Sequence, residues 1–335
     1  MNEIQSRRRR RVILLSVVVL AGAFAMWYWN RTESKVGRLM DEFRRVDEMH
    51  SSKDRWTNLN RLVNAIVAVG PEAPFYVLKQ LTNPPASWSA HVRLFNKAGA
   101  LGIKIPAPLD STRHQSSPAF AIQLMGTNAV ALAPALGSIA LSTNMDHGAR
   151  GNALLCLGNM GRNGADELIA VLQSPNASEW WLSAARSFQP ILRNSPELAA
   201  PVFQFYEKTP QADWDSRRRY FLCLMHMRAD PVRTTRLIRE ALSNPEDRMF
   251  TSAFTYAADY FKPPSNPSFS PLWSEAEQRI IPEAKRACVA DLQKLCLRLK
   301  DNRRVLDALK ELDLEAWQKT MDQLVQAAAS KADKR

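Results

Sequence analysis

The sequence predicts an all-α protein, an α-α superhelix preceded by one N-terminal transmembrane helix. Three observations support this fold class. Apolar residues recur with the period of helices and not of strands, helix-stopping prolines return at regular intervals, and an uncharged stretch follows a block of arginines. With 335 residues, 46% of them hydrophobic, the chain can bury a substantial core.

Residues 1–11 are predicted to be a basic cytoplasmic tail, and residues 12–29 a transmembrane anchor or uncleaved signal. The uncharged stretch would reach about 27 Å as a helix, close to the roughly 30 Å hydrocarbon layer of a bilayer. Arginines before it stay in the cytoplasm and aromatic rings after it suit the opposite interface. These orienting residues are Arg7, Arg8, Arg9, Arg10, Arg11, Trp27, Tyr28 and Trp29. We therefore expect a single-pass membrane protein with its bulk extracytoplasmic, periplasmic if the chain is bacterial.

Two alternatives to an anchor remain open. Ala23-Phe24-Ala25 has the small-x-small form of a signal-peptidase site, so cleavage after Ala25 would release the rest of the chain as a secreted protein. A buried core helix is the other alternative, and the flanking arginine block argues against it.

Residues 30–55 are predicted to form a polar stalk helix. The apolar residues Val36, Leu39, Met40, Phe43 and Val46 have the spacing of one helix face, and charged residues surround them. Such a helix either packs on the first repeat or is a solvated spacer, and we favour the spacer.

Residues 56–261 are predicted to be helical repeats. The prolines at 175, 210 and 245 are 35 residues apart, and Pro84 ends an earlier segment in the same way. Because proline cannot donate the helical backbone bond and disfavours helix in the residue before it, each marks the end of a unit. A second turn within each unit contains Gly or Pro, so every unit is predicted to be two helices joined by a short turn. One such hairpin cannot bury its apolar stripe alone, so we expect neighbours to stack.

Three segments resemble the signatures of a known repeat family. Val69-Gly70-Pro71-Glu72-Ala73, Leu157-Gly158-Asn159-Met160-Gly161 and the run from Asp146 to Ala153 look like the G-P-x-A, L-G-x-x-G and D-x-x-x-R-x-x-A patterns of HEAT-like repeats. The similarity covers roughly residues 57 to 250 and implies a HEAT-like/armadillo-like solenoid, an architecture whose members are usually scaffolds.

The remaining segments complete the predicted organisation. Residues 103–118 are rich in helix breakers and are predicted to be a loop, and residues 262–273 a Pro-rich loop. Residues 274–330 are predicted to be C-terminal helices that cap the solenoid: one long helix over 275–300 and one or two over 304–329. Residues 331–335 are expected to be a frayed, disordered tail.

The sequence indicates no catalytic, cofactor-binding or metal-binding residues. The five histidines are scattered and no H-x-x-x-H pair places two ligands on one helix face. His226 is expected to be a packed residue. Cys156 and Cys223 are expected to be buried free thiols, and Cys288 and Cys296 are about 12 Å apart along one helix, too far for a disulfide.

Two features are candidates for contact with a partner. Arg217, Arg218 and Arg219 form the sharpest basic cluster outside the N-terminus and could hold a phosphate or carboxylate. The other interpretation, which we favour, is a solvated helix face. Trp180 and Trp181 are adjacent on a helix and cannot both point inward, so Trp181 is expected in the core with Trp180 partly exposed.

The predicted function is therefore a non-enzymatic, membrane-anchored scaffold that binds a protein or peptide partner. The formal charge is +12, of which residues 1–35 carry +5, so the rest has only a mild positive bias. That bias falls short of the dense basic stripe of a nucleic-acid footprint. A solenoid that binds nucleic acid or processes DNA bases through a basic groove is the alternative, and binding of cell-wall or lipid polymers is a third possibility.

Overall fold

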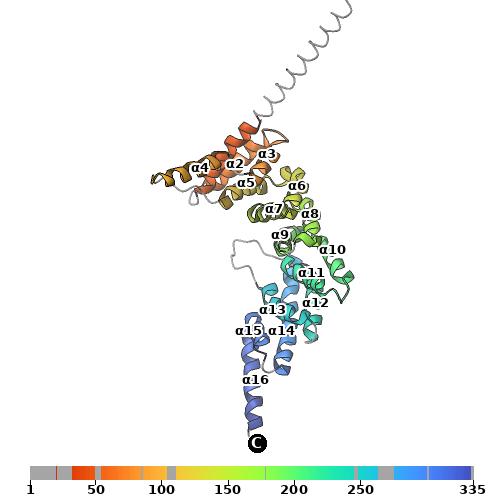
Figure 1. Cartoon of the computed structure of the whole chain (residues 1–335). Coiled ribbons are helices and arrows are strands. Elements are labelled where there is room, and N and C mark those ends of the chain that lie inside the picture. Colours follow the sequence, from red (N-terminus) through yellow and green to blue (C-terminus); the bar gives the residue numbers. More distant parts are fainter. Residues whose placement is uncertain are drawn as a thin grey trace, which may run out of the picture. The chain divides into compact units, whose positions relative to one another are not determined.

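The protein is all-helical throughout the part that the structure describes. The computed structural model (Figure 1) describes residues 20, 32–49, 54–83, 86–103, 111–177, 179–244, 248–262, 275–299 and 302–332. The predicted basic tail, the predicted anchor except for Leu20, and the predicted Pro-rich loop beyond residue 262 lie outside these ranges. No strand occurs among the described residues, which confirms the all-α prediction.

The helices have the following bounds in chain order. After a helix over residues 32–48, they are α2 (Arg55–Val67), α3 (Ala73–Thr82), α4 (Ala86–Ala100), α5 (Ser111–Met125), the 3₁₀ helix η1 (Gly126–Leu132), α6 (Ala133–Leu141), α7 (His147–Asn159), α8 (Arg162–Gln173), η2 (Pro175–Ala177), α9 (Trp181–Asn194), η3 (Pro196–Ala199), α10 (Ala200–Lys208), α11 (Trp214–Met227), α12 (Pro231–Ser243), α13 (Met249–Phe261), α14 (Glu275–Arg298), α15 (Arg303–Leu312) and α16 (Leu314–Ala332).

The chain divides into two compact units. Unit 1 comprises residues 1–135 and 144–156, and unit 2 comprises residues 136–143 and 157–335. The sequence did not suggest this division of the array over residues 56–261. Two of its boundaries fall within α6 and α7 and the third falls in the short connection between them, so no long linker marks the division.

Proline ends the helices where the sequence predicts. In α3, α8, α10 and α12, the last helical residue is followed by one cap residue and then by a proline. Those four cap residues, Asn83, Ser174, Thr209 and Asn244, have ψ values of 123°, 127°, 124° and 94°. The proline ring excludes its predecessor from the α region, which explains the extended backbone at all four positions.

The turns inside the hairpins use left-handed residues. Gly126 and Gly161 have φ values of +54° and +61°, a conformation that costs glycine little. The turn between α11 and α12 contains no glycine, and Arg228 takes its place with φ of +54°. Asp230 then caps α12, because its Oδ1 accepts bonds from the backbone N–H groups of Val232 and Arg233, both at 3.1 Å.

The expectation that residues 30–55 form a solvated spacer is wrong. Val36, Met40 and Phe43 are completely buried, so the helix over residues 32–48 is part of the core of unit 1. Asp47 of this helix accepts a bond from Arg55 of α2 at 2.6 Å and another from Ser117 of α5 at 2.9 Å. Burial of the apolar stripe outweighs the high charge of the segment because the charged residues occupy the other faces.

The predicted loop over residues 103–118 is also partly wrong. The helix α5 begins at Ser111 and continues through Pro118. Proline costs about 3 kcal/mol inside a helix, but Pro118 lies next to Ala119, Ala121 and Ile122, which are all buried. Their burial against α2 and α3 stabilises a helix that the local sequence disfavours.

A helical run over residues 115–141 is long and apolar enough to cross a membrane by length and composition, with a mean hydropathy of 1.5. It lies mid-chain, and 44% of its most apolar window is buried inside the protein. Within the run, α5 ends at Met125 and η1 begins at Gly126, which has a positive φ. The part formed by α5 packs on α2 and α3, which is the behaviour of a core helix.

Unit 2 is built from helix pairs in which alternate helices touch (Figure 1). In one series α9 packs on α11, α11 on α13 and α13 on α15, and in the other α12 packs on α14 and α14 on α16. Sequential helices α10 and α11, α12 and α13, and α15 and α16 also pack together. The helix predicted over 275–300 is confirmed as α14, and the segment 304–329 forms two helices, α15 and α16. The predicted frayed tail over 331–335 is wrong at its start, because α16 continues to Ala332, and residues 333–335 lie outside the described residues.

Candidate functional site

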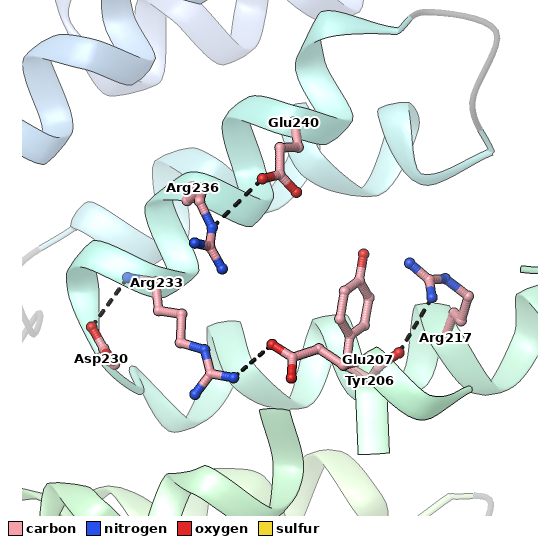
Figure 2. Close-up of polar contacts among 7 residues, drawn as sticks. All are labelled: Tyr206, Glu207, Arg217, Asp230, Arg233, Arg236 and Glu240. Carbon is pink, nitrogen blue, oxygen red and sulfur yellow. Dashed lines mark hydrogen bonds and ion pairs between the residues drawn. The ribbon is translucent and has the colours of Figure 1, made fainter. Parts of the chain in front are cut away.

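The three arginines predicted to bind a partner lie in the first half of α11 and are half-buried. Arg217 Nη1 donates to the backbone oxygens of Tyr206 at 3.3 Å and Thr209 at 3.0 Å, and its guanidinium lies 4.4 Å from the centre of the Tyr206 ring (Figure 2). These carbonyls belong to the C-terminal end of α10, where oxygens lack helical donors. Arg217 therefore caps α10.

The two other arginines contact different helices. Arg218 Nε donates to Ser252 Oγ of α13 at 3.1 Å, and Arg219 Nη2 donates to the backbone oxygen of Leu172 near the end of α8. Consecutive residues of a helix point about 100° apart, so the three guanidinium groups diverge. The structure thus gives each arginine its own intramolecular partner, and binding of an outside partner by these residues stays a prediction.

Trp180 precedes α9 and is half-buried, as the sequence suggested. Trp181 was expected in the core, but it is half-buried too. Positions 184, 185 and 188 carry the buried face of α9 instead, and all three side chains are completely inaccessible. The membrane-orienting residues Arg7 to Arg11 and Trp27 to Trp29 lie outside the described residues.

The four cysteines are free and buried, which confirms the prediction for Cys156 and Cys223. Burial raises the pKa of the thiols of Cys156 and Cys223 strongly, and raises those of Cys288 and Cys296 to about 12 and about 11. Because the thiolate is the reactive form, these groups are poor nucleophiles in the folded chain. In the described part of the chain, no three His, Cys, Asp or Glu side chains come together as a metal site would require.

His226 near the end of α11 is packed, as predicted. Its ring lies edge-on to Tyr256 at 5.6 Å between centres, and its Nε2 is buried without a hydrogen-bond partner. Burial lowers the pKa of His226 to about 4, and the nearby positive charge of Arg186 contributes. The imidazole is therefore neutral at physiological pH.

A cleft lies between α12 and α14, inside unit 2. Its volume is about 810 Å³, near the upper end of the roughly 300–1,000 Å³ range of ligand pockets. Apolar groups line it together with charged groups of both signs. The apolar lining consists of Val232, Leu242, Ile280, Ala284, Ala287 and Leu295, and the charged lining consists of Arg236, Arg239, Glu240, Glu283, Asp291, Lys294 and Arg298.

Ion pairs neutralise much of the charge in this cleft. Arg239 Nε of α12 donates to Asp291 Oδ2 of α14 at 2.6 Å, and this bond raises the pKa of the guanidinium further. Lys294 approaches the other oxygen of Asp291 at 4.0 Å. On α12, Arg236 Nε lies 3.5 Å from Glu240 Oε1 one turn later (Figure 2). The cleft therefore presents charges of both signs together with apolar groups, rather than a field of one sign.

Contacts with α10 also hold α12 in place. Arg233 Nη2 pairs with Glu207 Oε1 of α10 at 2.6 Å (Figure 2). The guanidinium of Arg233 also lies 4.2 Å from the centre of the Phe203 ring. With the Asp230 cap, this pair fixes the first turn of α12. The helix that forms one wall of the cleft is thus tied to α10 as well as to α14.

Sequence reasoning missed this cleft. Arg239 and Asp291 are 52 residues apart in the chain, so no local spacing connects them. The available signal was the cluster of Arg236, Arg239 and Glu240, whose spacing of three and four residues places them on one face of a helix. A scan of the chain against protein-family models finds no matching family, and a search of curated proteins finds no significant relative.

Proposed function

We propose that the protein is a non-enzymatic, membrane-anchored scaffold of HEAT-like helical repeats that binds a polypeptide partner on the extracytoplasmic side. The cleft between α12 and α14 is the proposed binding site, and it is the observation that carries the proposal. Its position between the second helices of two successive hairpins is where stacked repeats offer a continuous surface.

The repeat architecture is supported by the way that helices pack within unit 2. The hairpin of α11 and α12 contacts the hairpin of α13 and α14 through equivalent helices, α11 with α13 and α12 with α14. This nearest-neighbour pattern is what a solenoid requires, because each hairpin needs its neighbours to cover its apolar stripe. The resemblance of residues 146–161 to HEAT-like signatures points the same way.

The lining of the cleft favours a polypeptide over a nucleic acid. Four cations and three carboxylates line it, and the carboxylates of Asp291 and Glu240 are paired with arginines. These ion pairs leave little surplus positive charge in the cleft, and binding of a phosphate backbone depends on cations that neutralise it. A peptide that carries an apolar side chain and charges of both signs would match both the apolar and the charged lining.

The anchor and topology rest on the sequence of residues 1–29. Digestion of sealed, right-side-out membrane vesicles with an added protease tests them. We expect the bulk of the chain to be degraded from the extracytoplasmic side. A membrane-bound chain that is digested only from the cytoplasmic side would contradict the proposed topology.

Site-specific photocrosslinking tests the cleft. A photoreactive amino acid replaces Val232 or Ile280 in the cleft, and Val325 of α16 is the matched control, since Val232 and Val325 are 59% and 64% exposed. We expect a discrete polypeptide adduct from both cleft positions and none from position 325. A membrane-inserted chain that gives no polypeptide adduct at the cleft, or the same adducts at all three positions, would refute the proposal.

A further inference from the structure

The end of α4 exposes a line of large aliphatic side chains. Leu94, Leu101 and Ile103 are 60%, 74% and 56% exposed. Leu94 and Leu101 are seven residues apart, which places them on the same side of the helix and about 10.5 Å apart along its axis. The apolar line belongs to unit 1.

The turn that follows α4 is ordered by hydrogen bonds. Gly102 has φ of +71°, its N–H donates to Gly99 O at 3.1 Å, and the N–H of Ile103 donates to Ala98 O at 2.8 Å. These two bonds form a Schellman motif, the usual hydrogen-bonded end of a helix. The backbone of Ile103 is therefore fixed beside the last turn of α4.

Cations lie beside this line and the protein lies on its other side. At about 100° per residue, Lys97 and Arg93 are rotated by roughly 60° and 100° from Leu94 in one direction. Ala98, which is buried, is rotated by roughly 40° in the other. Going around α4, the order is protein contact, apolar line, basic residues.

The surrounding sequence contains no negative charge. Between Glu72 and Asp110 there is no Asp or Glu, whereas Lys79, Arg93, Lys97 and Lys104 are basic. Aliphatic side chains flanked by Lys and Arg are the composition of helices that lie in the interface of an anionic membrane. A polypeptide partner has no comparable requirement for an acid-free stretch of this length.

The chain length keeps unit 1 near the membrane. The proposed anchor ends at Trp29, and the helix over residues 32–48, whose Val36 is buried in unit 1, begins at Thr32. The two residues between them reach about 7 Å even when fully extended. The unit that carries α4 therefore lies within reach of the headgroups.

We propose that residues 93–103 lie in the membrane interface, with Leu94, Leu101 and Ile103 among the lipids and with Arg93 and Lys97 at anionic headgroups. This inference rests on the anchor of the proposed function. It assigns to α4 a role that the anchor alone does not require, because a tethered unit need not touch the bilayer.

The buried cysteines make the test direct. All four native cysteines are at most 1% exposed, so an introduced surface cysteine reacts selectively with a polarity-sensitive fluorophore. The variants Leu94→Cys and Leu101→Cys are labelled in the full chain, and Leu314→Cys in unit 2, which is 61% exposed, is the control. The chains are reconstituted into vesicles of phosphatidylcholine and phosphatidylglycerol, about 3:1, with and without lipids that carry a shallow doxyl quencher.

We expect the doxyl lipids to reduce emission at positions 94 and 101 at least about twofold, because interfacial helices insert about 5–10 Å, and to leave position 314 unchanged. The double substitution Arg93→Glu with Lys97→Glu should abolish the quenching at position 101. Flotation and protease digestion of the same vesicles report the anchor independently. If the chain is inserted but positions 94 and 101 are not quenched, the interfacial role of α4 is refuted while the anchor stands. If the chain does not float, both are refuted.

Discussion

Gly158 gives the sharpest test of how the helices are packed. It lies in the last turn of α7, and a Cβ at this position would come within 2.4 Å of the backbone oxygen of Ser187 in α9. Ordinary van der Waals contact begins at 3.4 Å. The replacement Gly158→Ala therefore requires two backbones to separate by about 1 Å, and overpacking of this kind costs about 1–3 kcal/mol.

The matched control is Gly37→Ala in the helix over residues 32–48. A Cβ there would meet nothing within 4 Å, so the same chemical change should stabilise unit 1 by about 0.5–1 kcal/mol through the loss of backbone entropy in the unfolded chain. The two substitutions thus have opposite expected signs. Urea denaturation of the solubilised full chain, followed by tryptophan fluorescence with the transitions fitted separately, measures both. Stabilisation by Gly158→Ala would refute the close approach of α7 and α9.

Three further predictions follow from the described contacts. Phe43→Ala should lower the free energy of unfolding by about 3–5 kcal/mol in denaturant titrations, because the ring is fully buried in unit 1. A loss below about 1 kcal/mol would contradict the burial of residues 32–48 in the core and support a solvated spacer. Arg217→Lys should destabilise nearly as much as Arg217→Ala, about 1–2 kcal/mol by the same titration, because a lysine cannot reproduce the planar donor geometry at the end of α10; full rescue by lysine would disprove the capping role. The pKa of His226 is lowered to about 4 in the folded chain. As the pH falls, the His226 imidazole is therefore protonated in the unfolded chain before it is protonated in the folded chain. Its stability contribution is therefore complete above about pH 6.5 and is lost towards pH 4, and His226→Gln should flatten this part of the curve of unfolding free energy against pH.

Local signals in the sequence were sufficient for the C-terminal ends of four helices. The residue before each proline has a restricted backbone whatever the tertiary structure, so the ends of α3, α8, α10 and α12 followed directly. Pro118 shows where this reasoning fails. The free-energy cost of a proline inside a helix can be predicted from the local sequence. The burial of Ala121 and Ile122 that offsets this cost depends on packing against α2 and α3, and the local sequence does not indicate that packing.

The charged residues were harder to interpret than the apolar ones, and the reason is physical. An apolar stripe has one favourable outcome, burial, so the stripe of Val36, Met40 and Phe43 contained the information that residues 32–48 belong to the core. A guanidinium has several outcomes of similar free energy: solvent, a carboxylate, an aromatic face or the end of a helix. Arg217 caps α10 and Arg239 reaches Asp291, yet nothing in their sequence neighbourhoods distinguishes the two. Which outcome an arginine takes depends on the helix that packs beside it, and so the cleft between α12 and α14 emerges only when the hairpins are placed together.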